Sequence, residues 1–507
     1  MKILLVNPEV PPTFWSFKNA LKFLSKDALL PPLGLLTVAG MLPRDWETKL
    51  IDMTTTKLRD RDIRWADYVF ITAMLIQQKS ADQVIERCRK MGVKVVAGGP
   101  LFTSLPEQYV HVDHLVLKEA ELTLPLFVRD LQKGCPVKVY DTQEKADLRQ
   151  TPAPLWDLIR MKRYAFMSIQ YSRGCPFDCD FCDVTIQFGH KIRTKTTEQV
   201  LEELETLYSH GWRGDVFFVD DNFIGNKSLL KADLLPAMID WMRTRQYPFS
   251  FNTQACINLA DDEELMELMV EAGFDCVFIG IETPNEDSLS ECNKVQNKGR
   301  DLVACVRKIQ RSGMQVQGGF ILGFDSDKPP IFDGLIQFIQ QSGIVTAMVG
   351  LLNAPKGTRL YHRLMTEGRL SEAGTGDNTD FSMNFVPKME IKDLLMGYRK
   401  VVSTIYSPGI YYERVLTFLR NYKPVKYNKV RFRFCDIRAF LKSIWRLGII
   451  DEGGLSYWKL IFWSLRRPRY LHLAVTLAIC GFHFRTIFEG YSPTQFGRTK
   501  GSHAAIF

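Results

Sequence analysis

The stretch Tyr171-Ser-Arg-Gly-Cys-Pro-Phe-Asp-Cys-Asp-Phe-Cys-Asp183 sets three cysteines within eight residues, in the spacing C-x3-C-x2-C. Its glycine and proline favour a tight loop, which lets three sulfurs converge on one point. The three cysteines are Cys175, Cys179 and Cys182. Because a [4Fe–4S] cluster takes four ligands, three thiolates leave one iron open. The spacing therefore predicts an iron–sulfur cluster whose open iron binds a further molecule.

Two other interpretations of these cysteines are a zinc knuckle and buried thiols that happen to lie close together. A structural zinc ion takes four Cys or His ligands. The nearest histidine along the chain, His190, does not have zinc-knuckle spacing. The iron–sulfur interpretation is therefore favoured.

The length and composition indicate a large intracellular protein. A chain of 507 residues with 46% hydrophobic residues is expected to form two or three domains. Its eleven cysteines follow no signal-peptide pattern, which indicates a reducing cytosol. Because Met1–Pro8 enters a buried-strand pattern directly, we expect no targeting segment before the fold. The apolar run Leu471–Phe484 has fourteen residues, too few to span a bilayer, so we expect a cytoplasmic protein.

The net charge of +8 is concentrated near the C-terminus. Residues 411–470 contain fourteen Lys or Arg and four Asp or Glu, interleaved with aromatic residues. Such a surface suits anionic lipid headgroups or nucleic acid, and a solvated basic face is an equally good interpretation. We expect peripheral contact with the inner membrane through residues 411–484, with nucleic acid as the less favoured partner.

Short apolar runs alternate with helical patterns in the first part of the chain. The candidate strands are Lys2–Asn7, Tyr68–Ala73, Val93–Gly98 and His114–Leu117. This alternation predicts an α/β fold with a doubly wound, Rossmann-like sheet, whose ligands bind at the carboxyl ends of the strands. We place this front domain at residues 1–135 and a proline-containing linker at 136–160.

The alternation resumes with longer helices, which predicts a partial (β/α)6 barrel over residues 161–370. The candidate strands are Met167–Tyr171, Asp215–Val219, Ser250–Gln254, Cys276–Ile281, Gln315–Leu322 and Val345–Leu351. A helical domain, basic and aromatic, is expected over residues 371–507.

Two motifs of the barrel add to the three cysteines. Glu282 ends the fourth strand, and Gly319-Phe-Ile-Leu-Gly-Phe324 lies in the fifth. Together they resemble the core of the radical S-adenosylmethionine (SAM) superfamily. The resemblance implies that the open iron binds SAM. Reductive cleavage of SAM would then give a 5′-deoxyadenosyl radical, which takes a hydrogen atom from an unactivated carbon.

Polar residues follow successive barrel strands, where contacts to SAM are expected. The candidates are Asp220, Asp221, Asn252, Gln254, Glu282 and Gly319. The aspartates would pair with an ammonium group and Glu282 would accept hydrogen bonds from a ribose. Gly319 would let adenine approach the backbone. Taken singly, each residue is also explained as a turn or a helix cap.

The front domain resembles the vitamin B12-binding module of one radical SAM branch. The resemblance rests on Lys2–Pro8, Pro31-Pro-Leu-Gly-Leu35, Val96-Ala-Gly-Gly-Pro100, Glu119-Ala-Glu121 and the barrel ending Leu352–Tyr361. It implies that cobalamin is bound. The D-x-H-x-x-G motif is absent, so residues 1–110 supply no lower axial histidine.

The candidate cobalamin contacts lie at the ends of the candidate strands Tyr68–Ala73 and Val93–Gly98 and in the Glu119-Ala-Glu121 motif. They are Thr72, Ala73, Met74, Gly98, Gly99 and Glu119. The other interpretation of the glycine pair is a turn that packs a helix against the sheet.

Within this branch the chain resembles the hopanoid C-2 methylases, for example in Gln170–Gly174, Arg193-Thr-Lys-Thr196 and Asp220–Asn226. The resemblance implies a C-methyltransferase that uses a [4Fe–4S] cluster, SAM and cobalamin, with a hopanoid lipid as substrate. Its electron donor would be of the flavodoxin or ferredoxin type. A radical SAM oxidoreductase or cyclase and an RNA-modifying radical SAM enzyme remain alternatives.

Overall fold

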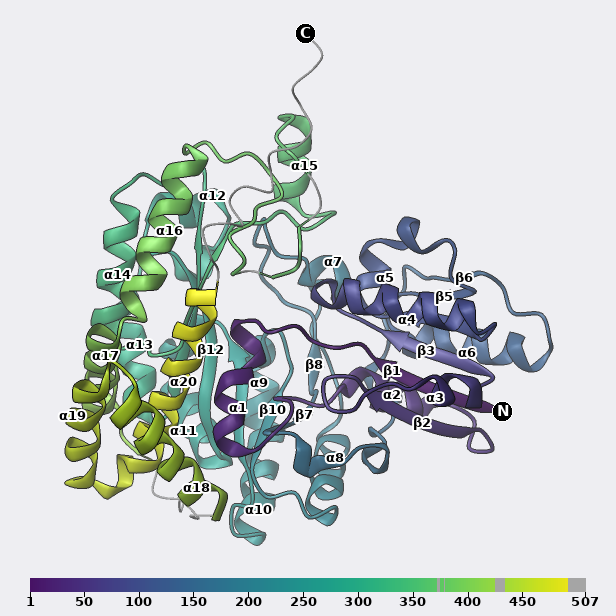
Figure 1. The fold of residues 1–507 in the computed structure, drawn as a ribbon, viewed down its shortest axis with the longest axis horizontal. Helices are drawn as coiled ribbons and strands as arrows, with labels where there is room; N and C mark the ends of the chain where they lie inside the picture. The colour runs from purple at the N-terminus through teal and green to yellow at the C-terminus, as the bar shows by residue number, and fades with distance from the viewer. Residues whose placement is uncertain (372–373, 378, 425–433, 491–507) are drawn as a thin grey trace.

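The computed structural model describes residues 1–371, 374–377, 379–424 and 434–490. Figure 1 shows three regions side by side. The front α/β domain lies on one flank of a central barrel, and the C-terminal helices lie on the other flank.

The front domain is built on a six-stranded parallel sheet. Its strand order is β2-β1-β3-β4-β5-β6. The strands are β1 (Lys2–Asn7), β2 (Glu47–Asp52), β3 (Tyr68–Thr72), β4 (Lys94–Gly98), β5 (His114–Val116) and β6 (Val139–Tyr140). The helices are α1 (Lys18–Leu24), α2 (Leu33–Met41), α3 (Asp60–Trp65), α4 (Gln78–Lys90), α5 (Pro100–Ser104) and α6 (Ala120–Gln132). The doubly wound prediction is confirmed, and the chain reverses direction across the sheet between β1 and β3, where such folds bind ligands.

The central sheet has its six strands in chain order, β7-β10-β11-β12-β13-β14, and all pairs are parallel. The strands are β7 (Met167–Ile169), β10 (Asp215–Phe218), β11 (Ser250–Ala255), β12 (Phe274–Glu282), β13 (Gln315–Leu322) and β14 (Ala347–Leu351). The first strand does not pair with the last, so the sheet is a partial barrel, as predicted.

Helices connect these strands and cover the outer face of the sheet. They are α8 (Thr197–Ser209), α10 (Leu235–Thr244), α11 (Glu263–Ala272), α12 (Glu286–Glu291), α13 (Leu302–Ser312) and α14 (Ile331–Ser342), and α15 (Arg359–Thr366) follows the last strand. Local capping fixes where several begin and end. Asp262 accepts a hydrogen bond from the Leu265 amide at 3.1 Å and starts α11, and Gly273, at φ 107°, ends it.

Burial alternates along the barrel strands. Outward residues such as Phe218, Ile279 and Phe320 are fully buried against the helices. The inward residues between them remain partly exposed, including Phe217, Asn252, Gln254, Phe278, Gln317, Ile321 and Met348. The inner face therefore presents both amide and apolar side chains to whatever enters the barrel.

The C-terminal region is helical, as predicted. Its helices are α16 (Ile391–Ile405), α17 (Pro408–Asn421), α18 (Phe434–Ser443), a π-helical segment (Ile444–Ile450), α19 (Gly454–Leu465) and α20 (Leu471–Gly490). The expectation that the apolar run Leu471–Phe484 is too short to span a bilayer is wrong, because it belongs to α20, which continues past Phe484 to Gly490. The segment Pro468–Gly490 is long and apolar enough to cross a membrane, and half of its most apolar window is buried inside the protein.

The segment before and within α1 leaves the front domain and packs on α20 (Figure 1). The Phe14 ring stacks on Phe484 with centroids 4.2 Å apart. His483 makes a 2.9 Å hydrogen bond from Nε2 to the Phe14 carbonyl. Burial lowers the pKa of His483 to about 4, so the neutral ring donates this bond at neutral pH.

Buried ion pairs join the front domain to the barrel. Arg173, in β8 (Ser172–Arg173), contacts Glu119 at 2.8 Å and Glu121 at 2.8 Å. Arg193, in β9 (Arg193–Thr194), contacts Glu119 at 2.9 Å. All four side chains are at most 13% exposed. Each charge is therefore paired where water cannot solvate it.

We predict that Arg173→Ala lowers the thermal unfolding midpoint by several degrees. It leaves the buried Glu121 without a cation and Glu119 with Arg193 alone, and breaking a buried pair costs about 3–5 kcal/mol. Arg149→Ala is the matched control, because the Arg149–Asp147 pair is exposed and such pairs contribute at most about 1 kcal/mol. Equal midpoints for the two variants in differential scanning calorimetry would contradict this account of the domain junction.

Candidate active site

The cysteine loop lies between β8 and α7 (Val184–Phe188), after the first barrel strand. Asp220 holds its start, because the buried carboxylate accepts hydrogen bonds from the amides of Tyr171, at 3.0 Å, and Ser172. Gly174 has φ 102°, and a Cβ there would lie 2.7 Å from the Lys191 carbonyl oxygen. A glycine is therefore required where the loop turns towards the cysteines.

Helix α15 and the loop after α12 hold the middle of the cysteine loop. Arg359 forms ion pairs with Asp178 and, at 2.7 Å, with Asp180. The Leu360 amide donates to the Asp180 carbonyl at 2.9 Å, and Asn293 donates to the Asp178 carbonyl at 2.8 Å. Sequence reasoning missed this clamp, although both aspartates stand inside the cysteine motif and were the available signal.

The three cysteines lie close enough to interact electrostatically, since the charge of Cys179 raises the pKa of both Cys175 and Cys182. Gln296 lies 3.6 Å from the Cys179 sulfur. No three Cys, His, Asp or Glu side chains among the described residues gather tightly enough to hold a single metal ion. The sulfur atoms that hold a [4Fe–4S] cluster lie farther apart than the ligands of a single metal ion, because each cysteine binds a different iron.

Burial also disfavours the thiolate form of these cysteines when no iron is bound. It raises the pKa of Cys182 to about 12, and it raises the pKa of Cys175. Bound iron would supply the positive charge that stabilises the thiolates. The donor set therefore fits an iron–sulfur cluster held by three cysteines.

Glu282 and Lys294 form a buried pair inside the barrel mouth. The Lys294 ammonium lies 2.6 Å from Glu282 Oε1. A Cβ at Gly280 would lie 2.3 Å from that oxygen, so the glycine makes room for the pair. The nearby Glu282 and Cys179 charges raise the pKa of Lys294 despite its burial, and the lysine stays charged. Oε2 of Glu282 remains available for the predicted ribose contact, which stays a prediction.

The other candidate SAM residues divide into two groups. Asn252 and Gln254 point from β11 into the barrel, and neither side chain makes a hydrogen bond within the described chain. Burial, together with the charges of Asp220 and Asp183, raises the pKa of Asp221 to about 7. These three side chains are open to a ligand.

Asp220 and Gly319 have internal roles. The Asp220 oxygens are occupied by the start of the cysteine loop. Gly319 admits the Phe278 ring, which lies 2.8 Å from the place of a Cβ. Trp15 in turn packs edge-on against Phe278 with centroids 5.4 Å apart. An ammonium contact by Asp220 is therefore not supported, and Gly319 has a packing reason to be glycine.

The candidate cobalamin residues lie at the carboxyl edge of the front sheet, which faces the barrel. Among them Met74 is 50% exposed and Ala73 is buried. A Cβ at Gly99 would lie 2.1 Å from Thr72 Oγ1, and one at Gly98 would lie 2.6 Å from the Val116 carbonyl oxygen. Atoms of the neighbouring strand residues Thr72 and Val116 occupy both spaces, which explains why these two positions are glycine.

Glu119 has both oxygens engaged within the protein. Oε1 pairs with Arg173 and Arg193, and Oε2 accepts a hydrogen bond from the Ala146 amide at 3.0 Å. Its position is therefore explained by the domain junction. Thr72 and the exposed Met74 remain the better candidates for contact with a corrin.

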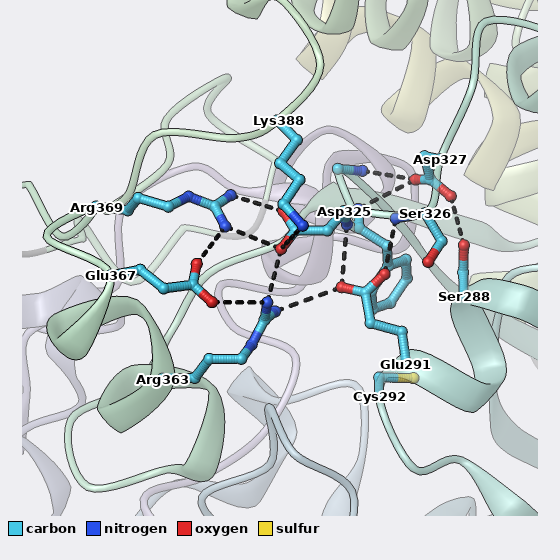
Figure 2. Close-up of polar contacts among 12 residues, drawn as sticks. Ser288, Glu291, Cys292, Asp325, Ser326, Asp327, Arg363, Glu367, Arg369 and Lys388 are labelled. Carbon is cyan, nitrogen blue, oxygen red and sulfur yellow. Dashed lines mark hydrogen bonds and ion pairs between the residues drawn. The ribbon is translucent and has the colours of Figure 1, made fainter.

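A polar network closes the barrel mouth on the side of β13 (Figure 2). Asp325 receives hydrogen bonds from Arg363, at 2.7 Å, and from Arg369, at 2.6 and 2.9 Å. Glu291 accepts from the amides of Asp325 and Ser326. The network ties the end of β13 to α12 and α15, the elements that clamp the cysteine loop.

The network predicts a pH-dependent stability. Burial acts to raise the pKa of Asp325, but the arginine hydrogen bonds outweigh it and lower the pKa to about 2. A carboxyl with a lowered folded pKa stabilises fully above its ordinary value and loses this effect as the pH falls towards the folded pKa. Asp325→Asn should therefore lower the unfolding midpoint at pH 7, and its difference from wild type should shrink between about pH 4 and pH 2.

Thermal denaturation at a series of pH values measures this difference. Asp333→Asn serves as the control, because its pair with Lys400 is exposed. A constant difference between wild type and Asp325→Asn down to the lowest pH would contradict the ionic role of Asp325.

Comparisons with known proteins agree with this geometry. The B12 binding domain model matches residues 26–128, the radical SAM superfamily model matches 169–339, and a domain of unknown function matches 358–495. The chain is 41% identical over 492 residues to an uncharacterized methyltransferase, sll1242, of Synechocystis sp., covering 96% of this chain and 91% of that protein. It is 31% identical over 491 residues to the hopanoid C-2 methylase of Rhodopseudomonas palustris, covering 94% and 92%.

Two solved structures share the fold. The cobalamin-dependent radical SAM enzyme OxsB, with aqua-cobalamin bound, has a TM-score of 0.62 at 14% identity, over 98% of this chain and 81% of that one. The radical SAM methyltransferase TsrM of Kitasatospora setae, with cobalamin and a [4Fe–4S] cluster bound, has a TM-score of 0.59 at 16% identity, over 94% and 99%.

Three features define the radical SAM enzymes with a cobalamin-binding domain: a B12-type sheet, a partial barrel that faces the carboxyl edge of this sheet, and a three-cysteine loop between them. This chain belongs to the cobalamin-dependent radical SAM methyltransferase family. Its cofactors are a [4Fe–4S] cluster, SAM and cobalamin. The cluster and SAM supply radical chemistry, and cobalamin supplies methyl transfer. The protein's part is to orient these groups and to keep water from the radical.

We predict that Cys175→Ala, Cys179→Ala or Cys182→Ala each abolishes SAM cleavage. Two thiolates cannot hold the cluster that three hold, so bound iron should fall as well. Cys135→Ala, at an exposed thiol outside the loop, is the control and should retain both properties. The measurements are iron content and 5′-deoxyadenosine formation after anaerobic reconstitution. Normal 5′-deoxyadenosine from any loop variant would contradict the assignment.

Proposed function

We propose that this enzyme methylates an unactivated carbon of an apolar polycyclic lipid, and that the lipid is a hopanoid methylated at C-2. The observation that carries the proposal is the 31% identity to a hopanoid C-2 methylase over 491 residues. That similarity extends through the front, barrel and C-terminal regions, so it is not confined to the parts that bind common cofactors.

The lining of the barrel supports an apolar substrate. Phe217, Phe278, Ile321 and Met348 are inward and only partly buried. A polycyclic hydrocarbon would cover these side chains, and burial of apolar surface contributes about 25 cal/mol per Å². In the sheet Asn252 lies beside Phe217 and Gln254 beside Phe278, so the amides that would contact SAM adjoin the apolar side chains that would contact the lipid.

The remaining cofactor contacts belong to this proposal. Asp221, Asn252, Gln254 and Glu282 would bind SAM, while Thr72 and Met74 would face cobalamin. Electrons would come from a donor of the flavodoxin or ferredoxin type. Peripheral contact with the inner membrane would give the enzyme access to a lipid substrate.

The test is to express the chain in a hopanoid-producing bacterium that lacks C-2 methylation and to profile its lipids. We expect a hopanoid that carries one additional methyl group, and no such hopanoid from cells that carry Cys175→Ala. Reconstitution with cobalamin, SAM and a reductant provides the second measurement. Formation of 5′-deoxyadenosine without any methylated hopanoid would reject the substrate and favour the oxidoreductase or cyclase alternative.

A further inference from the structure

The helical hairpin of α18, the π-helical segment and α19 exposes many large apolar side chains. Between residues 437 and 465 those at least half exposed are Ile437, Leu441, Trp445, Ile449, Ile450, Leu455, Phe462 and Leu465. Exposed apolar surface of this extent marks a site of interaction. In Figure 1 the hairpin lies at the edge of the molecule away from the front domain.

The first half of the hairpin is divided into three parallel rows. Ile437, Leu441, Trp445 and Ile449 repeat every four residues and are between 50% and 63% exposed. The next positions along the helix form a basic row, in which Arg438 and Arg446 are exposed and Lys442 donates to the Lys22 carbonyl at 2.7 Å. The positions after those, Ala439, Ser443 and Leu447, are buried. An apolar row and a basic row therefore lie side by side on the surface.

The π-helical segment keeps the apolar row straight. Four residues exceed one turn of an α-helix, so a row with this spacing drifts around an α-helix. A π-helix has more than four residues per turn, so four residues do not complete one turn. A row with this spacing therefore shifts around a π-helix in the direction opposite to its shift around an α-helix. The π-helical segment Ile444–Ile450 follows α18 directly, so the two drifts oppose each other along the row.

The second helix holds the same surface in place. Trp458 donates from its indole nitrogen to the Gly448 carbonyl at 3.0 Å, and Ser443 shares a 2.8 Å hydrogen bond with Tyr457. Both helices contact α20 on their inner sides, so their exposed residues face away from it. Among these are Leu455, 84% exposed, and Phe462, 57% exposed.

The charge of the hairpin indicates which kind of partner binds its exposed surface. Residues 434–470 contain seven Lys or Arg and three Asp or Glu. One of the three acids, Asp451, is already paired with Arg485. Apolar side chains beside a row of cations fit an interface with hydrocarbon below and anionic headgroups above. A nucleic-acid surface would supply the charge but would leave the aliphatic side chains in water.

We propose that this hairpin docks the enzyme on anionic membranes, with α18, the π-helical segment and α19 lying in the headgroup layer. The proposal gives a role to part of the C-terminal region that matches only a domain of unknown function. It does not depend on the identity of the lipid that is methylated.

The test is flotation of the full chain with vesicles of phosphatidylcholine alone or of equimolar phosphatidylcholine and phosphatidylglycerol. We expect binding to the anionic vesicles and much weaker binding to the neutral ones. Leu441→Ser combined with Trp445→Ser should reduce partitioning on the order of tenfold or more, since two large apolar side chains lose their burial. Arg438→Glu combined with Arg446→Glu should reduce binding to anionic vesicles only, again on the order of tenfold or more.

The matched control is Val110→Ser combined with Met396→Ser, because both side chains are exposed on other surfaces. It should bind as wild type does. No binding by wild type, or equal binding by the hairpin variants and the control, overturns the proposal. A change of oligomeric state in the hairpin variants, measured by light scattering, would assign the surface to a second copy instead. RNA binding that requires the same arginines, without vesicle binding, would assign it to nucleic acid.

Because flotation needs no turnover, its result is separate from the lipid-profiling result. Vesicle binding without a methylated hopanoid would leave the docking surface standing and reject the proposed substrate. A methylated hopanoid without vesicle binding would support the proposed substrate and reject the docking surface.

Discussion

The ion pairs of Arg173 and Arg193 with Glu119 and Glu121 hold the two halves of the active site together. Arg173 stands two residues before the first cluster cysteine, and Glu119 follows the fifth front strand. The same contacts therefore set the position of the cluster loop and of the sheet edge that faces it. Cofactors bound on the two domains would need to keep a fixed relative position, and buried paired charges resist displacement because each would be left unsolvated.

The fold was largely predictable because its signals are local. Continuous apolar runs predict buried parallel strands, and Gln315–Leu322 was placed with its correct bounds. Strand β2 escaped prediction because Glu47-Thr-Lys-Leu-Ile-Asp52 lies at an edge and keeps polar side chains in solvent. The length of the last helix was not predicted, since Arg485 interrupts the apolar run while its buried pair with Asp451 lets the helix continue.

The site was predictable where one short motif carries it and less so where distant segments meet. The three cysteines needed only their spacing. Asp220 looked like a ligand contact from its place after a strand, but its carboxylate serves the backbone of the cysteine loop. Lys294 and Arg359 carried no signal of their own, because their partners lie on other elements. Long-range ion pairs of this kind leave no periodic pattern in a sequence.

The contact between Phe14 and Phe484 joins residues that lie 470 positions apart in the sequence. The front sheet can form early, since all its strands lie within the first 140 residues. The segment that carries Phe14 and α1 also contacts Phe278 and α18, and its packing is complete only when α20 is present. The packing of α1 therefore waits for segments far along the chain, and part of its apolar surface stays uncovered on the nascent chain until they are made.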